Sequence, residues 1–107
     1  MIRILLTTVL AAALLLPGTA HSTDIPFIQV GGTTVSLGDS AGRVREAFGE
    51  PEWEETQKDI RVQRRHRVIV RDVNVWWYTL DTGWGRPKNY GFYILEGELV
   101  RIRRTGW

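Results

Sequence analysis

The sequence predicts an α+β domain in which one or two short helices pack on a three- to four-stranded antiparallel sheet. Three observations support this prediction. Residues 41–48 carry apolar side chains at three- and four-residue steps, as one face of a helix does. Residues 73–80 are rich in β-branched and aromatic side chains, which is typical of a strand. Residues 90–95 and 98–104 flank a Glu-Gly pair that can form a hairpin turn.

The first twenty residues are typical of a signal peptide. Arg3 supplies a positive start, residues 4–16 are almost entirely apolar, and small residues stand at Gly18 and Ala20. A membrane-spanning helix needs about 20 apolar residues, which is more than this stretch contains. We therefore expect cleavage near Ala20, a periplasmic or secreted product, and no transmembrane segment in the mature chain. The sequence has no cysteine, so we do not expect a lipoprotein.

The chain after this leader is expected to form a single domain. Residues 21–26 are expected to be a flexible N-terminus. Two short strands are expected at residues 27–30 and 33–37, on either side of a turn formed by two glycines. Residues 27–107 can build one core, although a chain of this size buries proportionally little surface.

The best-defined element is the helix expected at about residues 41–48. Asp39 or Ser40 can accept a hydrogen bond from an N–H group of the first turn. Gly49 can adopt the left-handed conformation that ends a helix, and Pro51 cannot continue one. The apolar face, which we expect to pack on the sheet, consists of Ala41, Val44, Ala47 and Phe48.

The order of the strands follows from composition. The sheet is expected to begin near residues 53–57 and to continue through an extended or partly looped segment at residues 59–70. Glycine, proline and asparagine predict a loop over residues 81–89. Within the strand at residues 73–80, composition favours Val73, Val75 and Trp77 as the core face, because Asn74 lies on the other face. The alternative core face consists of Trp76, Tyr78 and Leu80.

The final hairpin has two possible registers. A two-residue turn pairs Leu95 with Glu98, whereas a three-residue turn with a bulge at Gly97 pairs Ile94 with Glu98. We favour the second register because it collects apolar side chains on one face, namely those of Phe92, Ile94, Val100 and Ile102.

Short motifs in these elements carry a family resemblance. They are a V-x-L-G-D-S segment before the helix (Val35 to Ser40), G-E-P after it (Gly49 to Pro51), W-x-Y (Trp76 to Tyr78) and G-x-L-V-x-I (Gly97 to Ile102). Across residues 28–104 the chain resembles the SmpA/OmlA-like (BamE-like) envelope domain, and more closely a family of small exported bacterial proteins with the same layout. The resemblance implies an envelope protein that binds another macromolecule or acts as an assembly accessory, and it favours Trp76 and Tyr78 as core residues. Members of the closer family usually carry cysteines near the start and at the helix end, and this chain has none.

Charge is distributed unevenly along the chain. Residues 39–59 contain seven acidic and three basic side chains, whereas residues 60–107 contain four acidic and ten basic ones. The whole chain has a net charge of only +2, so composition does not imply a nucleic-acid partner.

Nothing in the sequence predicts a reaction. The chain has two histidines and no cysteine, without the spacings of a zinc or haem site, so we expect no metal and no cofactor. His66 has no adjacent serine, cysteine or carboxylate that would make it a catalytic base. We therefore expect a protein that is not an enzyme and has no catalytic residues.

The candidate binding residues are arginines and tryptophans. Arginine forms bidentate pairs with phosphate and carboxylate groups, and tryptophan is enriched at binding hot spots. We predict one partner surface that combines Arg64, Arg65 and Arg67 with Trp84 and with whichever of Trp76 and Trp77 lies off the core. The expected partner is another envelope protein. The alternatives are a secreted inhibitor of a hydrolase, and a protein that binds an anionic lipid or glycan through the arginine run.

Overall fold

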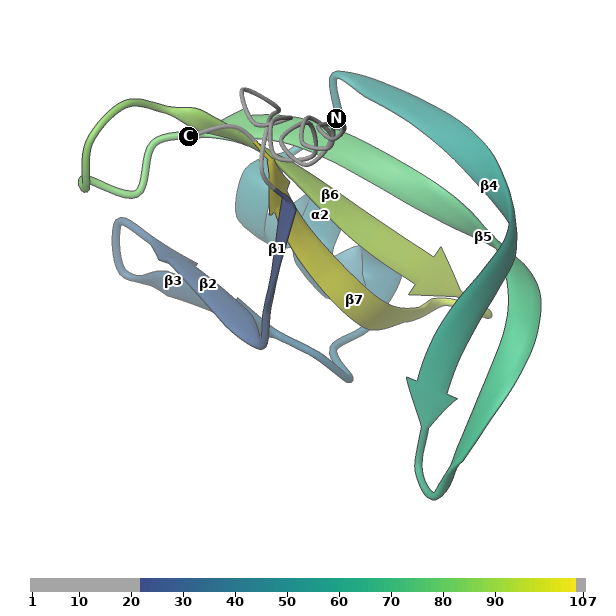
Figure 1. Ribbon diagram of the computed structural model, residues 1–107. Helices are drawn as coiled ribbons and strands as arrows, with labels where there is room; N and C mark the ends of the chain where they lie inside the picture. Colours follow the sequence, from purple (N-terminus) through teal and green to yellow (C-terminus); the bar gives the residue numbers. More distant parts are fainter. Residues whose placement is uncertain (1–21, 106–107) are drawn as a thin grey trace, which may run out of the picture.

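The chain folds mainly into β-structure. The computed structural model describes residues 22–105, and the expected signal peptide lies outside this range (Figure 1). A five-stranded antiparallel sheet has the order β1-β7-β6-β5-β4, and β2 and β3 form a separate two-stranded sheet. The elements are β1 (Ser22–Ile25), β2 (Phe27–Val30), β3 (Thr33–Ser36), α2 (Ala41–Phe48), β4 (Trp53–Arg64), β5 (Arg67–Leu80), β6 (Lys88–Leu95) and β7 (Glu98–Thr105).

The predicted α+β class with a three- to four-stranded sheet is therefore wrong. Two segments account for the difference: residues 22–25 add a fifth strand, and residues 59–70, expected to be extended or partly looped, lengthen β4 and β5. A two-residue turn at Arg65 and His66 joins β4 to β5, with Arg64 paired to Arg67. An irregularity between Gln57 and Ile60 lets β4 bend without leaving the sheet. The alternation of charged and apolar residues in this segment is compatible with a strand. Burial of Val62 against the curled sheet favours the strand conformation.

The segment expected to be a flexible N-terminus is also a strand where the structure describes it. Residues 22–25 form β1 and pair with β7, from Ser22 opposite Thr105 to Ile25 opposite Ile102. The carboxylate of Asp24 lies 3.4 Å from Arg101 and 3.2 Å from Arg103. Backbone pairing to β7 therefore extends the sheet by one strand.

The predicted helix is confirmed at residues 41–48. The N–H of Arg43 donates to Ser40 Oγ over 3.1 Å, so Ser40 is the N-terminal cap. The N–H of Gly49 donates to the carbonyl of Arg45 over 2.7 Å, with φ of 81° at Gly49. Asp39 acts in the preceding turn instead, where its carboxylate accepts from the N–H of Ser36.

Each face of the large sheet carries one cluster of buried apolar side chains. On the first face, α2 and the β2–β3 hairpin cover a cluster that includes Val44, Trp76, Tyr78, Phe92, Leu99 and Ile102. On the opposite face, a second cluster consists of Val62, Val73, Val75, Tyr93 and Leu95. The long β4–β5 hairpin curls away from the rest of the sheet, as Figure 1 shows. The strand at residues 73–80 therefore has no single core face, because each of its two faces lines one of these clusters.

The register favoured for the last hairpin is wrong. Leu95 pairs with Glu98 across a two-residue turn, in which Glu96 and Gly97 both have positive φ. The bulge lies further along, between the pairs Ile94–Leu99 and Tyr93–Arg101. As a result the side chain that joins Ile102 in the first cluster is Leu99, while that of Val100 packs against the second.

Candidate functional site

The predicted arginines lie at the far end of the β4–β5 hairpin. We call residues 61–71 the arginine hairpin; its turn lies at the lower right of Figure 1. A groove of about 490 Å³ runs along one face of this segment. Four arginines, one histidine, one isoleucine and one glutamate line it: Arg64, Arg65, His66, Arg67, Ile69, Arg71 and Glu96.

Arg64 ties the arginine hairpin to the turn between β6 and β7. Its guanidinium donates to Glu98 over 2.8 Å and to Glu96 over 3.2 Å. The hydrogen bond to Glu98 is the main cause that raises the pKa of Arg64 above its usual value. The two carboxylates offset the charge of Arg64, so this residue positions the hairpin more than it attracts a ligand.

Arg65, Arg67 and Arg71 are the available cations of this groove. All three are exposed, and within residues 22–105 none of them forms an ion pair. Arg67 and Arg71 lie on one face of β5 because their positions differ by an even number, and Arg65 stands in the turn beside them. A guanidinium group presents several N–H donors in one plane, so this arrangement favours a ligand with several anionic oxygens.

Trp76, one of the predicted binding residues, is part of the core. Its side chain lies in the cluster beneath α2, and the guanidinium of Arg45 lies 4.5 Å from the centre of the indole ring. Arg45 also contacts Glu50 at 3.5 Å and Glu54 at 3.9 Å. Trp76 therefore holds the helix on the sheet and offers no surface to a partner.

Trp77 packs on the opposite face of the sheet. Its ring stacks on Trp53 with 5.7 Å between ring centres, and its Nε1 donates to Glu55 over 2.8 Å. Hydrogen bonds from Gln57 and from Trp77 lower the pKa of Glu55. A Cβ atom at Gly91 would lie 2.9 Å from the Trp77 ring, so the ring covers the backbone at Gly91. Of the pair, Trp77 is the one that is partly exposed.

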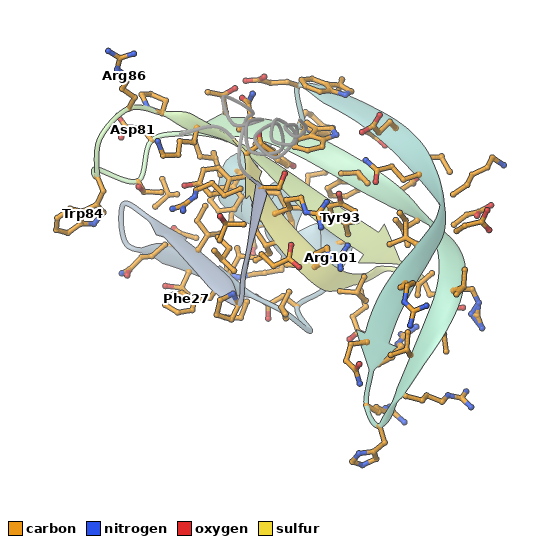
Figure 2. All side chains as sticks on the ribbon, viewed as in Figure 1. Phe27, Asp81, Trp84, Arg86, Tyr93 and Arg101 are labelled. Carbon is orange, nitrogen blue, oxygen red and sulfur yellow. The ribbon has the colours of Figure 1, made fainter. Side chains whose placement is uncertain are left out.

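Trp84 lies far from the arginine hairpin. It is 85% exposed in the loop that follows β5, whereas Arg65 stands in the turn that precedes β5. Figure 2 shows Trp84 at the tip of its loop, near the end of the β2–β3 hairpin. The prediction of one surface that combines Trp84 with Arg64, Arg65 and Arg67 is therefore wrong, because the fourteen residues of β5 separate the two groups.

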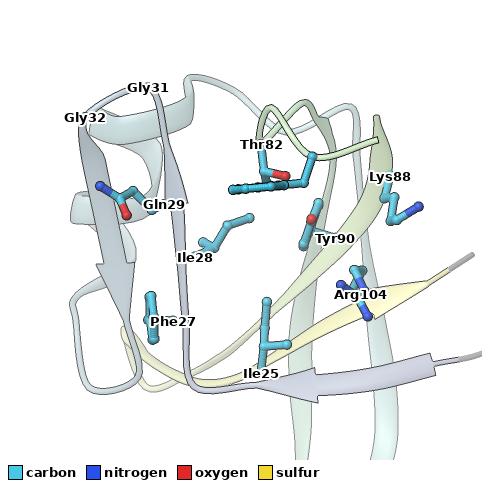
Figure 3. A pocket seen from close by; sticks show the side chains of 11 residues that line it. Ile25, Phe27, Ile28, Gln29, Gly31, Gly32, Thr82, Lys88, Tyr90 and Arg104 are labelled. Carbon is cyan, nitrogen blue, oxygen red and sulfur yellow. The ribbon is translucent and has the colours of Figure 1, made fainter. Parts of the chain in front are cut away.

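A second groove lies beside Trp84, and we call it the Trp84 groove (Figure 3). Its volume is about 740 Å³. The walls come from the β1–β2 junction, the β2–β3 turn, the loop after β5, and the adjacent ends of β6 and β7. The lining residues are Ile25, Phe27, Ile28, Gln29, Gly31, Gly32, Thr82, Trp84, Lys88, Tyr90 and Arg104.

The sequence did not single out three residues that contribute exposed or partly exposed side chains, two in the Trp84 groove and one beside Trp77. Phe27 is 53% exposed in the Trp84 groove, and Trp53 is 49% exposed beside Trp77. Arg104 lines the Trp84 groove, whereas in the sequence it is only one of the ten basic residues of the C-terminal half. An aromatic residue at the start of a predicted strand was the available signal for Phe27 and Trp53. Nothing in the local sequence places Arg104 in the same groove as Phe27; Arg104 reaches it through the pairing of β7 with β1 and β6.

Comparisons with protein-family models, with curated proteins and with solved structures gave no match to this chain. The resemblance to the SmpA/OmlA-like domain therefore stays a prediction. Within residues 22–105, no helix is long and apolar enough to span a membrane. In the same range, no group of three or more histidine, cysteine or acidic side chains could hold a metal ion.

Proposed function

We propose that this protein is a non-enzymatic binding module of the cell envelope that holds a phosphate-bearing lipid or glycan in the groove of the arginine hairpin. The observation that carries the proposal is the exposed trio of Arg65, Arg67 and Arg71. The only acidic residue lining the groove is Glu96, and Arg64 already pairs with it. The trio therefore presents an excess of positive charge to an incoming anion.

The residues of the arginine hairpin groove are suited to binding a ligand. Arginine stays protonated at physiological pH, so it binds and orients anions but does not exchange protons with them. Ile69 lies between Arg67 and Arg71 on the same face of β5 and supplies an apolar contact beneath the charges. Val68 and Val70 are about half exposed on the opposite face, so a surface that surrounds the hairpin would also meet apolar side chains.

The test is vesicle binding by a triple variant. The purified protein is titrated with phosphatidylcholine vesicles that either contain or lack phosphatidylglycerol. Each arginine near an anionic membrane contributes about 1 kcal/mol, so Arg65→Gln, Arg67→Gln and Arg71→Gln together should weaken binding on the order of 100-fold. Binding should also weaken as ionic strength rises from about 0.05 to about 0.2 M.

A second triple variant controls for net charge. Arg43→Gln, Lys58→Gln and Arg86→Gln remove the same number of charges outside the groove, at one partly exposed site and two exposed sites. Equal losses in the two triple variants would show that general charge, and not the groove, binds the vesicles. If the protein does not bind the vesicles but does bind a soluble phosphorylated oligosaccharide through the trio, the ligand is a glycan. If neither ligand depends on the trio, the proposal is wrong.

The protein-partner and hydrolase-inhibitor hypotheses depend on exposed aromatic residues more than on the arginines. Because Trp84 and the arginine hairpin are separate surfaces, substitutions in one leave the other intact. The same set of variants therefore distinguishes lipid or glycan binding from protein binding.

A further inference from the structure

The Trp84 groove combines features that the arginine hairpin lacks. It lies between the β2–β3 hairpin and the large sheet, on the sheet face that α2 also covers (Figure 3). Ile28 and Tyr90 are buried at its base, whereas Phe27 and Trp84 are exposed at its margins. The groove therefore has apolar side chains at its base, aromatic rings at its margins, and polar groups along the rest of its lining.

One backbone edge faces this groove. Residues 27–29 of β2 line it and no residue of β3 does, so the outer edge of β2 borders the groove. The N–H of Leu37 donates to the carbonyl of Pro26, and pairing alternates along an antiparallel ladder. The backbone groups of Ile28 and Val30 therefore point toward β3, and those of Phe27 and Gln29 point outward. Within residues 22–105, no backbone group outside the β2–β3 ladder pairs with Phe27 or Gln29.

The loop that carries Trp84 holds the indole in solvent. Gly83 and Gly85 flank it with φ of 91° and 75°, values that L-residues with side chains rarely adopt. The N–H of Gly83 donates to the carboxylate of Asp81 over 2.9 Å, which fixes the start of the turn. A large aromatic ring at an exposed and defined position is typical of a residue that anchors a partner.

The positive charge of the Trp84 groove favours an acidic partner. Lys88 and Arg104 line it from neighbouring strands, and no acidic side chain does. Within residues 22–105, Arg104 forms no ion pair. An occupant with carboxylate groups would complement this charge, and an occupant with a free backbone would complement the edge of β2.

We propose that the Trp84 groove binds an extended acidic peptide segment of a partner protein. The segment adds a third strand to the β2–β3 sheet along β2, where main-chain hydrogen bonds supply affinity. One apolar side chain of the segment lies between Trp84 and Phe27, and a carboxylate lies near Arg104. Since β2 has four residues, the segment that pairs with it is roughly four to six residues long. This proposal does not depend on the arginine hairpin.

The probe is a synthetic hexapeptide in which valine and glutamate alternate, and its control is the same peptide with lysine in place of glutamate. Both are titrated into the labelled protein while backbone amide signals are recorded by NMR. The acidic peptide should bind at least about tenfold more tightly than the basic one, because like charges across an interface disfavour binding. On binding, the amides of Phe27 and Gln29 should become protected from hydrogen exchange.

Two substitutions test the side chains, each with a control. Trp84→Ala should weaken binding of the acidic peptide about tenfold or more, as loss of an aromatic anchor does. Arg104→Gln should weaken it about fivefold, whereas Arg86→Gln, which removes an arginine from the loop that carries Trp84, should not. Figure 2 shows Arg86 pointing away from the molecule. The triple arginine-hairpin variant should bind the peptide as the unchanged protein does.

Gln29→Pro tests the backbone edge, since it removes one outward N–H group without removing a β2–β3 hydrogen bond. It should weaken peptide binding while the amide spectrum of β3 stays unchanged. If the variant loses the amide signals of β3, it has not folded correctly. Protection of the Phe27 and Gln29 amides in the unchanged protein then shows whether the peptide pairs with β2. Equal binding of the acidic and basic peptides, or protection elsewhere in the chain, would overturn the proposal. Occupation of the groove by a fatty acid in place of the peptide, or by a second copy of the chain, would do so as well.

Discussion

At the scale of single residues, the tryptophans of this domain have different roles. Trp76 is buried under Arg45, Trp77 stacks on Trp53, and Trp84 stands in solvent. The same side chain can thus hold a helix, cover a backbone or stand exposed in a loop. What decides its role is the face of the strand or the loop on which it lies.

Tyr78 shows how burial at one residue changes its titration. Its hydroxyl donates to the carbonyl of Gly49 over 2.8 Å, and the ring packs against Phe48 and Phe92. Burial raises the pKa of Tyr78 to about 12, although the charge of nearby Arg45 lowers it. Tyr78 therefore stays protonated in the folded protein at a pH where an exposed tyrosine ionises.

Tyr78→Phe should give a pH-dependent change in stability. At pH 8 the variant should lose about 0.5–1.5 kcal/mol, because the hydrogen bond to Gly49 is missing. Above pH 10 the unfolded tyrosine releases its proton while the folded one keeps it, so the unchanged protein loses stability as pH rises toward 12. The gap between the two proteins should therefore narrow over this range.

Urea unfolding at a series of pH values from 8 to 11 measures this gap. Comparison of the two proteins cancels the titration of the other tyrosines and of the lysines. A gap that stays constant or widens above pH 10 would contradict the burial of Tyr78.

At the scale of elements, both backbone hydrogen bonds and an apolar face attach α2 to the sheet. The N–H of Leu99 donates to the carbonyl of Asp39, and the N–H of Ala41 donates to the carbonyl of Gly97, both over 2.8 Å. These bonds attach the start of the helix to the start of β7. The other end is attached through Phe48, whose ring centre lies 5.6 Å from that of Phe92.

Phe48→Ala tests the side-chain contact at the end of the helix. The side chain is partly buried, so the free energy of unfolding should fall by about 2–3 kcal/mol, less than the roughly 3–5 kcal/mol for a fully buried phenylalanine. Chemical denaturation gives this value directly. Glu46→Ala, on the exposed face of the same helix, should change stability by less than about 0.5 kcal/mol. A loss below about 1 kcal/mol for Phe48→Ala would show that the helix does not depend on this contact.

At the scale of the whole molecule, the long β4–β5 hairpin sets the distance between the two candidate surfaces. The arginine hairpin lies at one end of β5, and the loop with Trp84 lies at the other. The intervening strands carry both apolar clusters, so each surface is supported by packed side chains.

This separation predicts that the two sites act independently. Substitutions more than about 10 Å apart without shared partners usually add within about 0.5 kcal/mol. Combination of Trp84→Ala with the triple arginine variant should therefore reduce vesicle binding and peptide binding by the same factors as the separate variants do. Isothermal titration with each probe measures this, and a coupling above about 1 kcal/mol would mean that the two surfaces form one site.

The sequence by itself determined the local structures. The apolar spacing and the flanking Ser40 and Gly49 predicted α2 with correct limits, because caps and helical periodicity depend on neighbours within one or two turns. The loop with Trp84 followed from its glycines and proline for the same reason. Arg64, Arg65 and Arg67 line one groove because they are near neighbours in the chain, and their role in binding stays a prediction.

Tertiary structure alone decided how many strands the sheet has, which faces are buried and which candidate residues meet. Residues 22–25 become a strand only because β7 offers an edge, and residues 59–70 only because the hairpin curls until Val62 is covered. A bulge at Val100 places the side chain of Leu99 on the face where strict alternation would place that of Val100. Alternation along the strand alone does not reveal this shift. Arg104 lies in the same groove as Trp84, and the arginines of the arginine hairpin do not. The reason is that strand pairing sets the distances between residues that are remote in the chain.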